Sequence, residues 1–141
     1  MREIIVGLML CIQSYWDLRY KEIPSVVSVI GGLLGACIWC WTDKNGIEMV
    51  LSLLPGILCL FCGWISKEEV GYGDGILLCV LGIYYTLEEL VVIGMIAIGS
   101  AGICGLVLLI LFHKNRRYEI PFVPFLLLGW VIETVSVYGG F

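Results

Sequence analysis

Charged residues are scarce in this chain of 141 residues, since only 14% are Asp, Glu, Lys or Arg and 60% are apolar. Soluble domains have about 25% charged and about 45–50% apolar residues, so there is too little polar surface here to cover a water-soluble globule. Positive charge is also in deficit, because the net charge is −4, which excludes a protein that binds nucleic acid through a basic stripe. The mean hydropathy of +1.02 excludes a disordered chain. The composition leaves pores, transporters, assembly subunits and membrane-embedded enzymes.

Apolar runs account for most of the chain, and six of them can be counted between the charge clusters. Because a spanning helix needs about 20 mostly apolar residues, they predict an all-α integral membrane protein with a six-transmembrane-helix bundle. The connections are short, so residues 1–141 are expected to form a single membrane-embedded domain. The first and fourth runs reach spanning length only by including the polar residues at their Asp17 and Asp74 ends. The runs are 4–16, 24–41, 47–65, 75–87, 90–112 and 120–138.

Lysine and arginine are unevenly distributed among the predicted loops. Six of the eight follow the first, third and fifth runs, and the other two are Arg2 and Lys44. Because cytoplasmic loops retain positive charge, the three basic loops are expected to be cytoplasmic and both termini to lie outside. The predicted location is therefore the plasma (inner) membrane, as a multi-pass protein in contact with the lipid bilayer.

Asp17 and Asp74 differ from the other acids because each lies where an apolar run meets the predicted cytoplasmic surface. An ionisable group at such a position is costly and is by default a functional candidate. Asp17 is followed by Ile23-Pro24, and proline suits the start of a helix. Asp74 lies within Gly71-Tyr72-Gly73-Asp74-Gly75, whose three glycines leave the backbone open to the approach of another chain.

The predicted topology puts both aspartates on the same leaflet, which suggests a shared mechanism. Two close carboxyls cannot both ionise easily, so one proton is shared between them. The ionised carboxyl can take a proton from water while the protonated one polarises a peptide carbonyl, as in aspartic proteases. The alternative for a single carboxylate is a helix cap or an ion pair, with Arg19 or Lys21 within reach of Asp17.

Three motifs in this order resemble the type IV prepilin peptidases over nearly the whole chain: Asp17 with Ile23-Pro24, Gly71-Tyr72-Gly73-Asp74, and residues 120–126, which read Ile-Pro-Phe-Val-Pro-Phe-Leu. The resemblance implies a GxGD-type aspartic endopeptidase that removes the short basic leader of type IV prepilins or pseudopilins at the cytoplasmic face. It also implies that Asp17 and Asp74 are catalytic. The residues implied to position the substrate or shape the loops are Gly71, Gly73, Gly75, Ile23, Pro24, Pro121 and Pro124.

Larger members of that family have an added amino-terminal region that supports N-methylation of the new terminus. The resemblance is to the short, peptidase-only branch, which implies cleavage without methyl transfer. The sequence departs from the family pattern at three positions. Ser25 stands where Asn is frequent, Ile76 where Lys is frequent and Val123 where Gly is frequent. We expect these departures to bear on substrate preference, because none removes a carboxylate.

A basic leader would be attracted by acids on the same leaflet, and we expect Glu22, Glu68 and Glu69 to supply this attraction. The substrate's apolar helix would pack laterally on the bundle. The glycine-rich segment 71–75 is the expected moving part. No nucleic acid is expected as a partner, and the oligomeric state is left open.

Two cysteine pairs, Cys37 with Cys40 and Cys59 with Cys62, have the spacing of a four-thiolate zinc site. Both pairs fall inside apolar runs, where a charged thiolate cluster would lack polar support. We therefore predict that these cysteines are packing residues, and that the protein uses no metal or other cofactor. The alternative to an enzyme is a non-catalytic membrane scaffold subunit of a pilus or secretion assembly, in which both aspartates form interface salt bridges.

Overall fold

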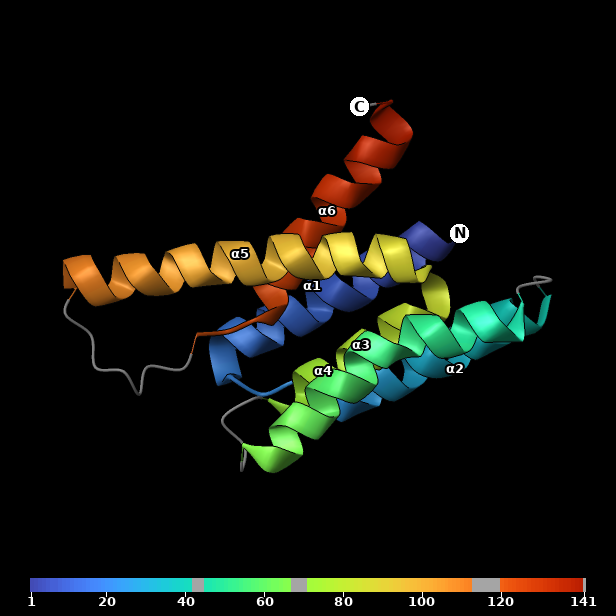
Figure 1. Ribbon diagram of the computed structural model, residues 1–141, viewed down its shortest axis with the longest axis horizontal. Coiled ribbons are helices and arrows are strands. Elements are labelled where there is room, and N and C mark those ends of the chain that lie inside the picture. Colours follow the sequence, from blue (N-terminus) through green and yellow to red (C-terminus); the bar gives the residue numbers. More distant parts are fainter. Residues whose placement is uncertain (42–44, 67–70, 113–119, 141) are drawn as a thin grey trace.

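The computed structural model describes residues 1–41, 45–66, 71–112 and 120–140. Within these ranges the chain is entirely helical, with six helices and no strand (Figure 1). The prediction of an all-α protein is confirmed for the described residues, and each predicted apolar run corresponds to one helix. The helices are α1 (Arg2–Tyr20), α2 (Ser25–Trp41), α3 (Gly46–Ile65), α4 (Tyr72–Tyr84), α5 (Leu87–Phe112) and α6 (Val123–Gly139).

Two of the described helices are long and apolar enough to cross a membrane: α3, and residues 87–111 of α5. Only 17% of the most apolar stretch of each is buried inside the protein. Large side chains such as Leu106 and Ile110 of α5 are therefore exposed. A core helix of a soluble protein would bury most of this surface, so the exposed apolar residues are better matched to lipid.

The helices pack in two groups (Figure 1). In one group α4 packs against α3 and α2, and in the other α6 packs against α5 and α1. Contacts between the groups are smaller, and they join α1 to α2 and α4 and also α5 to α3 and α4. Asp17 lies on α1 and Asp74 on α4, so each group carries one of the two aspartates.

Glycines allow α3 and α4 to approach closely. A side-chain carbon at Gly75 would lie 3.0 Å from the backbone nitrogen of Leu60, and one at Gly82 would overlap the carbonyl oxygen of Ser52. The Ser52 hydroxyl in turn donates a hydrogen bond of 2.6 Å to the Gly82 carbonyl. Small residues at a helix interface permit this type of packing in a membrane. The α3–α4 pair is therefore a close-packed support for the segment that carries Asp74.

The buried face of α1 changes character along the helix. Its positions recur at the three- and four-residue spacing of one helix face. The face is apolar near the amino terminus of the helix and polar near Asp17. Its residues are, in order, Val6, Met9, Leu10, Gln13, Ser14 and Asp17.

Helix α5 begins earlier than its apolar run. The run was predicted to start at residue 90, whereas the helix starts at Leu87 and includes Glu88 and Glu89 in its first turn. The backbone N–H of Thr86 donates to the Glu89 carboxylate at 2.9 Å, and the Glu89 N–H donates to the Thr86 hydroxyl at 3.4 Å. This reciprocal pair is a capping box. The two glutamates are therefore part of the helix and do not form the turn before it.

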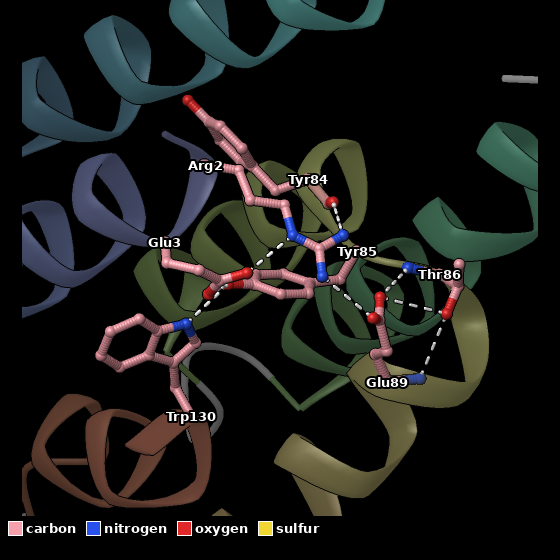
Figure 2. Close-up of polar contacts among 7 residues, drawn as sticks. All are labelled: Arg2, Glu3, Tyr84, Tyr85, Thr86, Glu89 and Trp130. Carbon is pink, nitrogen blue, oxygen red and sulfur yellow. Dashed lines mark hydrogen bonds and ion pairs between the residues drawn. The ribbon is translucent and has the colours of Figure 1, made fainter. Parts of the chain in front are cut away.

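A network of polar side chains ties the helices together at the end of the bundle opposite Asp17 (Figure 2). The Arg2 guanidinium donates to the carboxylates of Glu3 at 2.7 Å and Glu89 at 3.1 Å. The Tyr85 hydroxyl donates to Glu3 at 2.5 Å and accepts from the Trp130 indole N–H at 2.6 Å. These bonds connect α1, the α4–α5 turn, α5 and α6. We call this the Arg2 network; its members are Arg2, Glu3, Tyr84, Tyr85, Thr86, Glu89 and Trp130.

Candidate active site

Asp17 lies in the last turn of α1 and is only 7% exposed. Its carboxylate oxygen Oδ2 accepts a hydrogen bond of 3.0 Å from the backbone N–H of Val123, and the Phe122 N–H also bonds this carboxyl. Both amides belong to the amino-terminal end of α6, where unpaired N–H groups and the helix dipole favour negative charge. The start of α6 therefore forms an anion-binding end for the Asp17 carboxylate.

Two prolines shape this end of α6. Pro124 lies in the first turn, where its missing N–H costs nothing, and Pro121 precedes the helix. Ile120 lies beside α5, because a side-chain carbon added at Gly105 would be 3.2 Å from Ile120 Cδ1. The predicted role of Pro121 and Pro124 in shaping a loop is consistent with this position, next to the amides that bond Asp17.

Asp74 is the third residue of α4. Its own N–H donates to the Gly71 carbonyl at 3.1 Å, which starts the helix. A side-chain carbon added at Gly71 would lie 3.0 Å from Asp74 Oδ2, and one added at Gly73 would lie 2.8 Å from Ile23 Cδ1. The two glycines therefore leave the space that the carboxyl and Ile23 occupy. The contact at Gly73 also joins the Ile23-Pro24 motif to the glycine motif.

Both aspartates lie just outside the apolar runs 4–16 and 75–87, at the ends of those runs. Burial raises the pKa of Asp17, and the amides of Val123 and Phe122 oppose this shift. Burial, followed by the negative charge of Asp17, raises the pKa of Asp74 to about 7. The two groups therefore interact. The ionised form is supported by backbone donors at Asp17, whereas the protonated form is favoured at Asp74.

The predicted alternative partner for Asp17 was a basic residue of the following loop. Arg19 instead donates to the Tyr15 hydroxyl at 3.0 Å, and its guanidinium lies 5.9 Å from the centre of the Tyr20 ring. The hydrogen bonds of the Asp17 carboxylate run to the α6 backbone. The carboxylate therefore caps the start of α6 from another helix, which agrees with the cap alternative, whereas Arg19 is directed toward the side chains of Tyr15 and Tyr20.

The remaining predicted positions fall into two sets. Pro24 immediately precedes α2 and accepts a hydrogen bond of 3.0 Å from the Val27 N–H, while Gly75 is buried against Leu60. Glu22 is exposed at the same end of the bundle as Asp17. Glu68 and Glu69 lie outside the described residues, so their predicted attraction of a leader stays a prediction.

The departures from the family pattern leave the described contacts intact. Ser25 and Ile76 are exposed. Val123 is wholly buried, and it bonds Asp17 through its backbone N–H, which any residue except proline would supply. These positions therefore change side chains around the two carboxyls without removing a donor.

The cysteine pairs are divided between two helices, with Cys37 and Cys40 on α2 and Cys59 and Cys62 on α3. Among the described residues no group of three or more histidine, cysteine or acidic side chains could hold a metal ion. The zinc interpretation gains no support from this part of the chain. The absence of a cofactor remains a prediction.

Two features near Asp17 were missed by the sequence analysis. The only sequence signal for the α6 amides was the pair of prolines at 121 and 124. These prolines predict the start of a helix, but they do not predict that its amides bond Asp17. Gln13 is wholly buried, and it lies four residues before Asp17 on the same face of α1. A lone glutamine inside an apolar run, one helical turn from a candidate carboxylate, was the signal for the second feature.

Comparison with known proteins gives a family match and a similar relative. The model of a family described as the type IV leader peptidase family matches residues 4–110. A prepilin leader peptidase/N-methyltransferase of Xanthomonas campestris pv. campestris is 25% identical over 143 aligned positions, which cover 92% of this chain and 48% of that protein. The chain therefore spans about half the length of the curated relative it matches. No solved structure matches it.

Proposed function

Since the chain belongs to the type IV leader peptidase family, we propose that it is a membrane-embedded aspartic endopeptidase that removes the basic leader of type IV prepilins or pseudopilins. The observation that carries the mechanism is that the negative charge of Asp17 helps to raise the pKa of Asp74, which joins a buried and a half-buried carboxyl from motifs 57 positions apart. A pair of carboxyls with different surroundings can divide acid and base roles between them.

The proposed roles follow from the surroundings of each carboxyl. Asp17, which accepts hydrogen bonds from the α6 amides, is the ionised base, and Asp74 is the protonated acid. Asp17 takes a proton from water as the water oxygen attacks the scissile carbonyl carbon. Asp74 gives its proton to the carbonyl oxygen. The product of this step is a tetrahedral diol, with Asp17 protonated and Asp74 ionised.

Collapse of the diol returns both protons. Asp17 gives its proton to the leaving nitrogen as the carbon–nitrogen bond breaks, and one diol hydroxyl gives its proton to Asp74. The products are a carboxylic acid on the leader and a free amine on the mature chain. The two aspartates regain their starting protonation states, and no covalent intermediate is required.

The proposal includes a membrane orientation. All six helices cross the bilayer, both termini lie outside, and the two aspartates lie at the cytoplasmic face of the plasma membrane. The exposed apolar surface of α3 and α5 supports immersion in lipid. The basic residues of the loops after α1, α3 and α5 support the orientation. The substrate's basic leader would then approach from the side that carries Glu22.

The test is cleavage by the purified full chain in detergent or lipid. The substrate is a synthetic prepilin peptide with a basic leader and an apolar segment, and mass spectrometry identifies the products. We expect one cut between leader and apolar segment, which chelation by EDTA leaves unaffected. An added methyl donor should leave the mass of the new terminus unchanged. A peptide that stays intact under all conditions would favour the non-catalytic scaffold subunit instead.

A further inference from the structure

Gln13 is a buried polar residue to which the proposed mechanism assigns no role. It is 0% exposed, and its amide nitrogen Nε2 donates to the Ser28 hydroxyl of α2 at 2.7 Å. Its amide oxygen Oε1 is buried, and it has no hydrogen-bond partner in the part of the chain that the structure describes. Turning the amide over would exchange the two ends, but Ser28 would still satisfy only one of them.

An unpartnered amide oxygen at this depth is costly, because it has lost its hydrogen bonds to water and gained none in return. Buried polar groups in folded proteins almost always have a partner. A leucine would fill a similar volume without this cost. The unsatisfied oxygen therefore indicates a partner that is present when the protein works, and a water molecule is small enough to supply it.

The position of Gln13 on α1 indicates where that water would lie. Residues four apart share a helix face, and helical side chains lean toward the amino terminus, so the Asp17 carboxyl leans toward the turn that carries Gln13. Ser14 is buried between them in sequence, at 6% exposure. The polar part of the α1 face is therefore continuous from Gln13 to Asp17.

We infer that Gln13 Oε1 accepts a hydrogen bond from the water molecule that Asp17 activates. This inference rests on the proposed function and adds a residue to it. One hydrogen of the water points to the Asp17 carboxylate and the other to Gln13, so the oxygen lone pair is free to face the scissile carbonyl. The amide is neutral and does not compete for the transferred proton.

The experiment compares Gln13→Leu with Ser28→Ala in the peptide cleavage assay. Both variants remove the bond between α1 and α2, but only Gln13→Leu removes the amide oxygen. We expect Gln13→Leu to lower kcat by about 10- to 100-fold with KM within about twofold of wild type, a loss that corresponds to about one hydrogen bond to the reacting water. Ser28→Ala should keep kcat within about threefold.

Thermal unfolding of each purified variant shows whether it is folded. If Gln13→Leu is unstable, Gln13→Met, which has a more adaptable side chain, takes its place in the comparison. Equal losses of kcat in the Gln13 and Ser28 variants would overturn the inference, because the amide would then act only by joining two helices. Full kcat in a folded Gln13 variant would also overturn it while leaving the peptidase proposal intact. Failure of the wild type to cleave would reject both.

Discussion

The Arg2 network and the aspartate end of the bundle differ in how their polar side chains are paired, although the buried Trp39 Nε1, near Tyr85 and Thr86, also has no hydrogen-bond partner among the described residues. In the Arg2 network, hydrogen bonds join the side chains of Arg2, Glu3, Tyr85, Glu89 and Trp130 (Figure 2), and the cation of Arg2 faces two carboxylates. At the other end, Asp17 is buried and Asp74 is half-buried, and the Gln13 oxygen has no hydrogen-bond partner among the described residues. A network in which every polar group has a hydrogen-bond partner stabilises a fold. Buried polar groups without such partners are costly, and they are typical of sites that act on another molecule.

Helix packing is also closer within one group of helices than between the two groups. The α3–α4 pair is close-packed through Gly56, Gly75 and Gly82, whereas α1 makes smaller contacts with α4. Asp17 and Asp74 therefore belong to two groups of helices that are joined to each other less extensively than either group is joined internally. The Arg2 network joins the same two groups at the far end, through Arg2 and the Tyr84 carbonyl. The comparison suggests that the far end maintains the fold while the aspartate end retains freedom to admit a substrate.

Apart from the replacement of an aspartate, the largest expected effect is the pH dependence of cleavage. Because the pKa of Asp74 is raised to about 7, its acid form is present below that pH and is lost as the pH rises through it. We expect kcat/KM to fall about tenfold for each pH unit above the pKa, or about 100-fold at two units above it. Rates of peptide cleavage between about pH 5 and pH 9 measure this. A rate that stays constant over the range would contradict the assignment of Asp74 as the acid.

The raised pKa of Asp74 also predicts how the free energy of unfolding depends on pH. The unfolded chain ionises Asp74 near its ordinary pKa of 3.8. Between that pH and about 7 the folded state therefore binds more protons, and the free energy of unfolding should fall as pH rises. Asp74→Asn should remove this part of the pH dependence in denaturant titrations. An identical dependence in the variant would show that other groups cause it.

The next effect tests the close packing of α3 and α4. Gly82→Ala would force a methyl group against the Ser52 carbonyl, and we expect the free energy of unfolding to fall by about 1–3 kcal/mol, as in other overpacked sites. Gly94→Ala is the matched control, because an added carbon there has nothing within 4 Å. Thermal unfolding should separate the two variants. Equal stability of both would refute the close approach of the helices at Gly82.

An effect of similar size is expected from Tyr85→Phe in the Arg2 network. The change leaves the Trp130 N–H and the Glu3 carboxylate each without one partner, so we expect a loss of about 1–3 kcal/mol in unfolding free energy. Cleavage by the folded variant should stay within about twofold of wild type. Tyr138→Phe is the control, since Tyr138 is 70% exposed. A large loss of kcat without a loss of stability would show that the two ends do not have separate tasks.

The smallest effect concerns attraction of the basic leader. Glu22→Gln should raise KM by about twofold at low salt, and the difference should disappear at high salt because exposed charges are screened. Glu88→Gln provides the control, since Glu88 is exposed at the opposite end. Steady-state kinetics at two salt concentrations measure both variants. Equal changes in the two would show that Glu22 has no special position relative to the substrate.

The sequence predicted the helices more accurately than their ends. Long apolar runs identify helices because few other structures use them, but the run 75–87 and the helix Tyr72–Tyr84 are offset by about one turn. The offset has two local causes. The Gly71 carbonyl accepts a hydrogen bond from the Asp74 N–H, so α4 begins before Asp74. The capping box at Thr86 includes Glu89 in the first turn of α5. The Thr-x-x-Glu pattern could have predicted the start of α5, whereas the early start of α4 was difficult to predict because it lies among glycines.

The candidate site was predictable only in part. Alternating helices put Asp17 and Asp74 at one end, and their motifs identified the residues around them. The donors to Asp17 could not be deduced, since Val123 is 106 positions away and its amide is available only because α6 starts there. The burial of Gln13 depends likewise on which face α1 turns toward α2. Such features are set by packing between distant segments and leave little trace in local patterns.

If Asp17 and Asp74 share one hydrolytic reaction, the loss of either carboxyl should stop cleavage, and the cleavage rates of two single variants measure this. Asp17→Asn and Asp74→Asn, purified as folded proteins, are incubated with the prepilin peptide, with Glu48→Gln as a control at an exposed acid. We expect each aspartate variant to lose cleavage by about 1,000-fold or more, whereas the control should keep its rate. Cleavage at the wild-type rate by either aspartate variant would contradict the shared reaction.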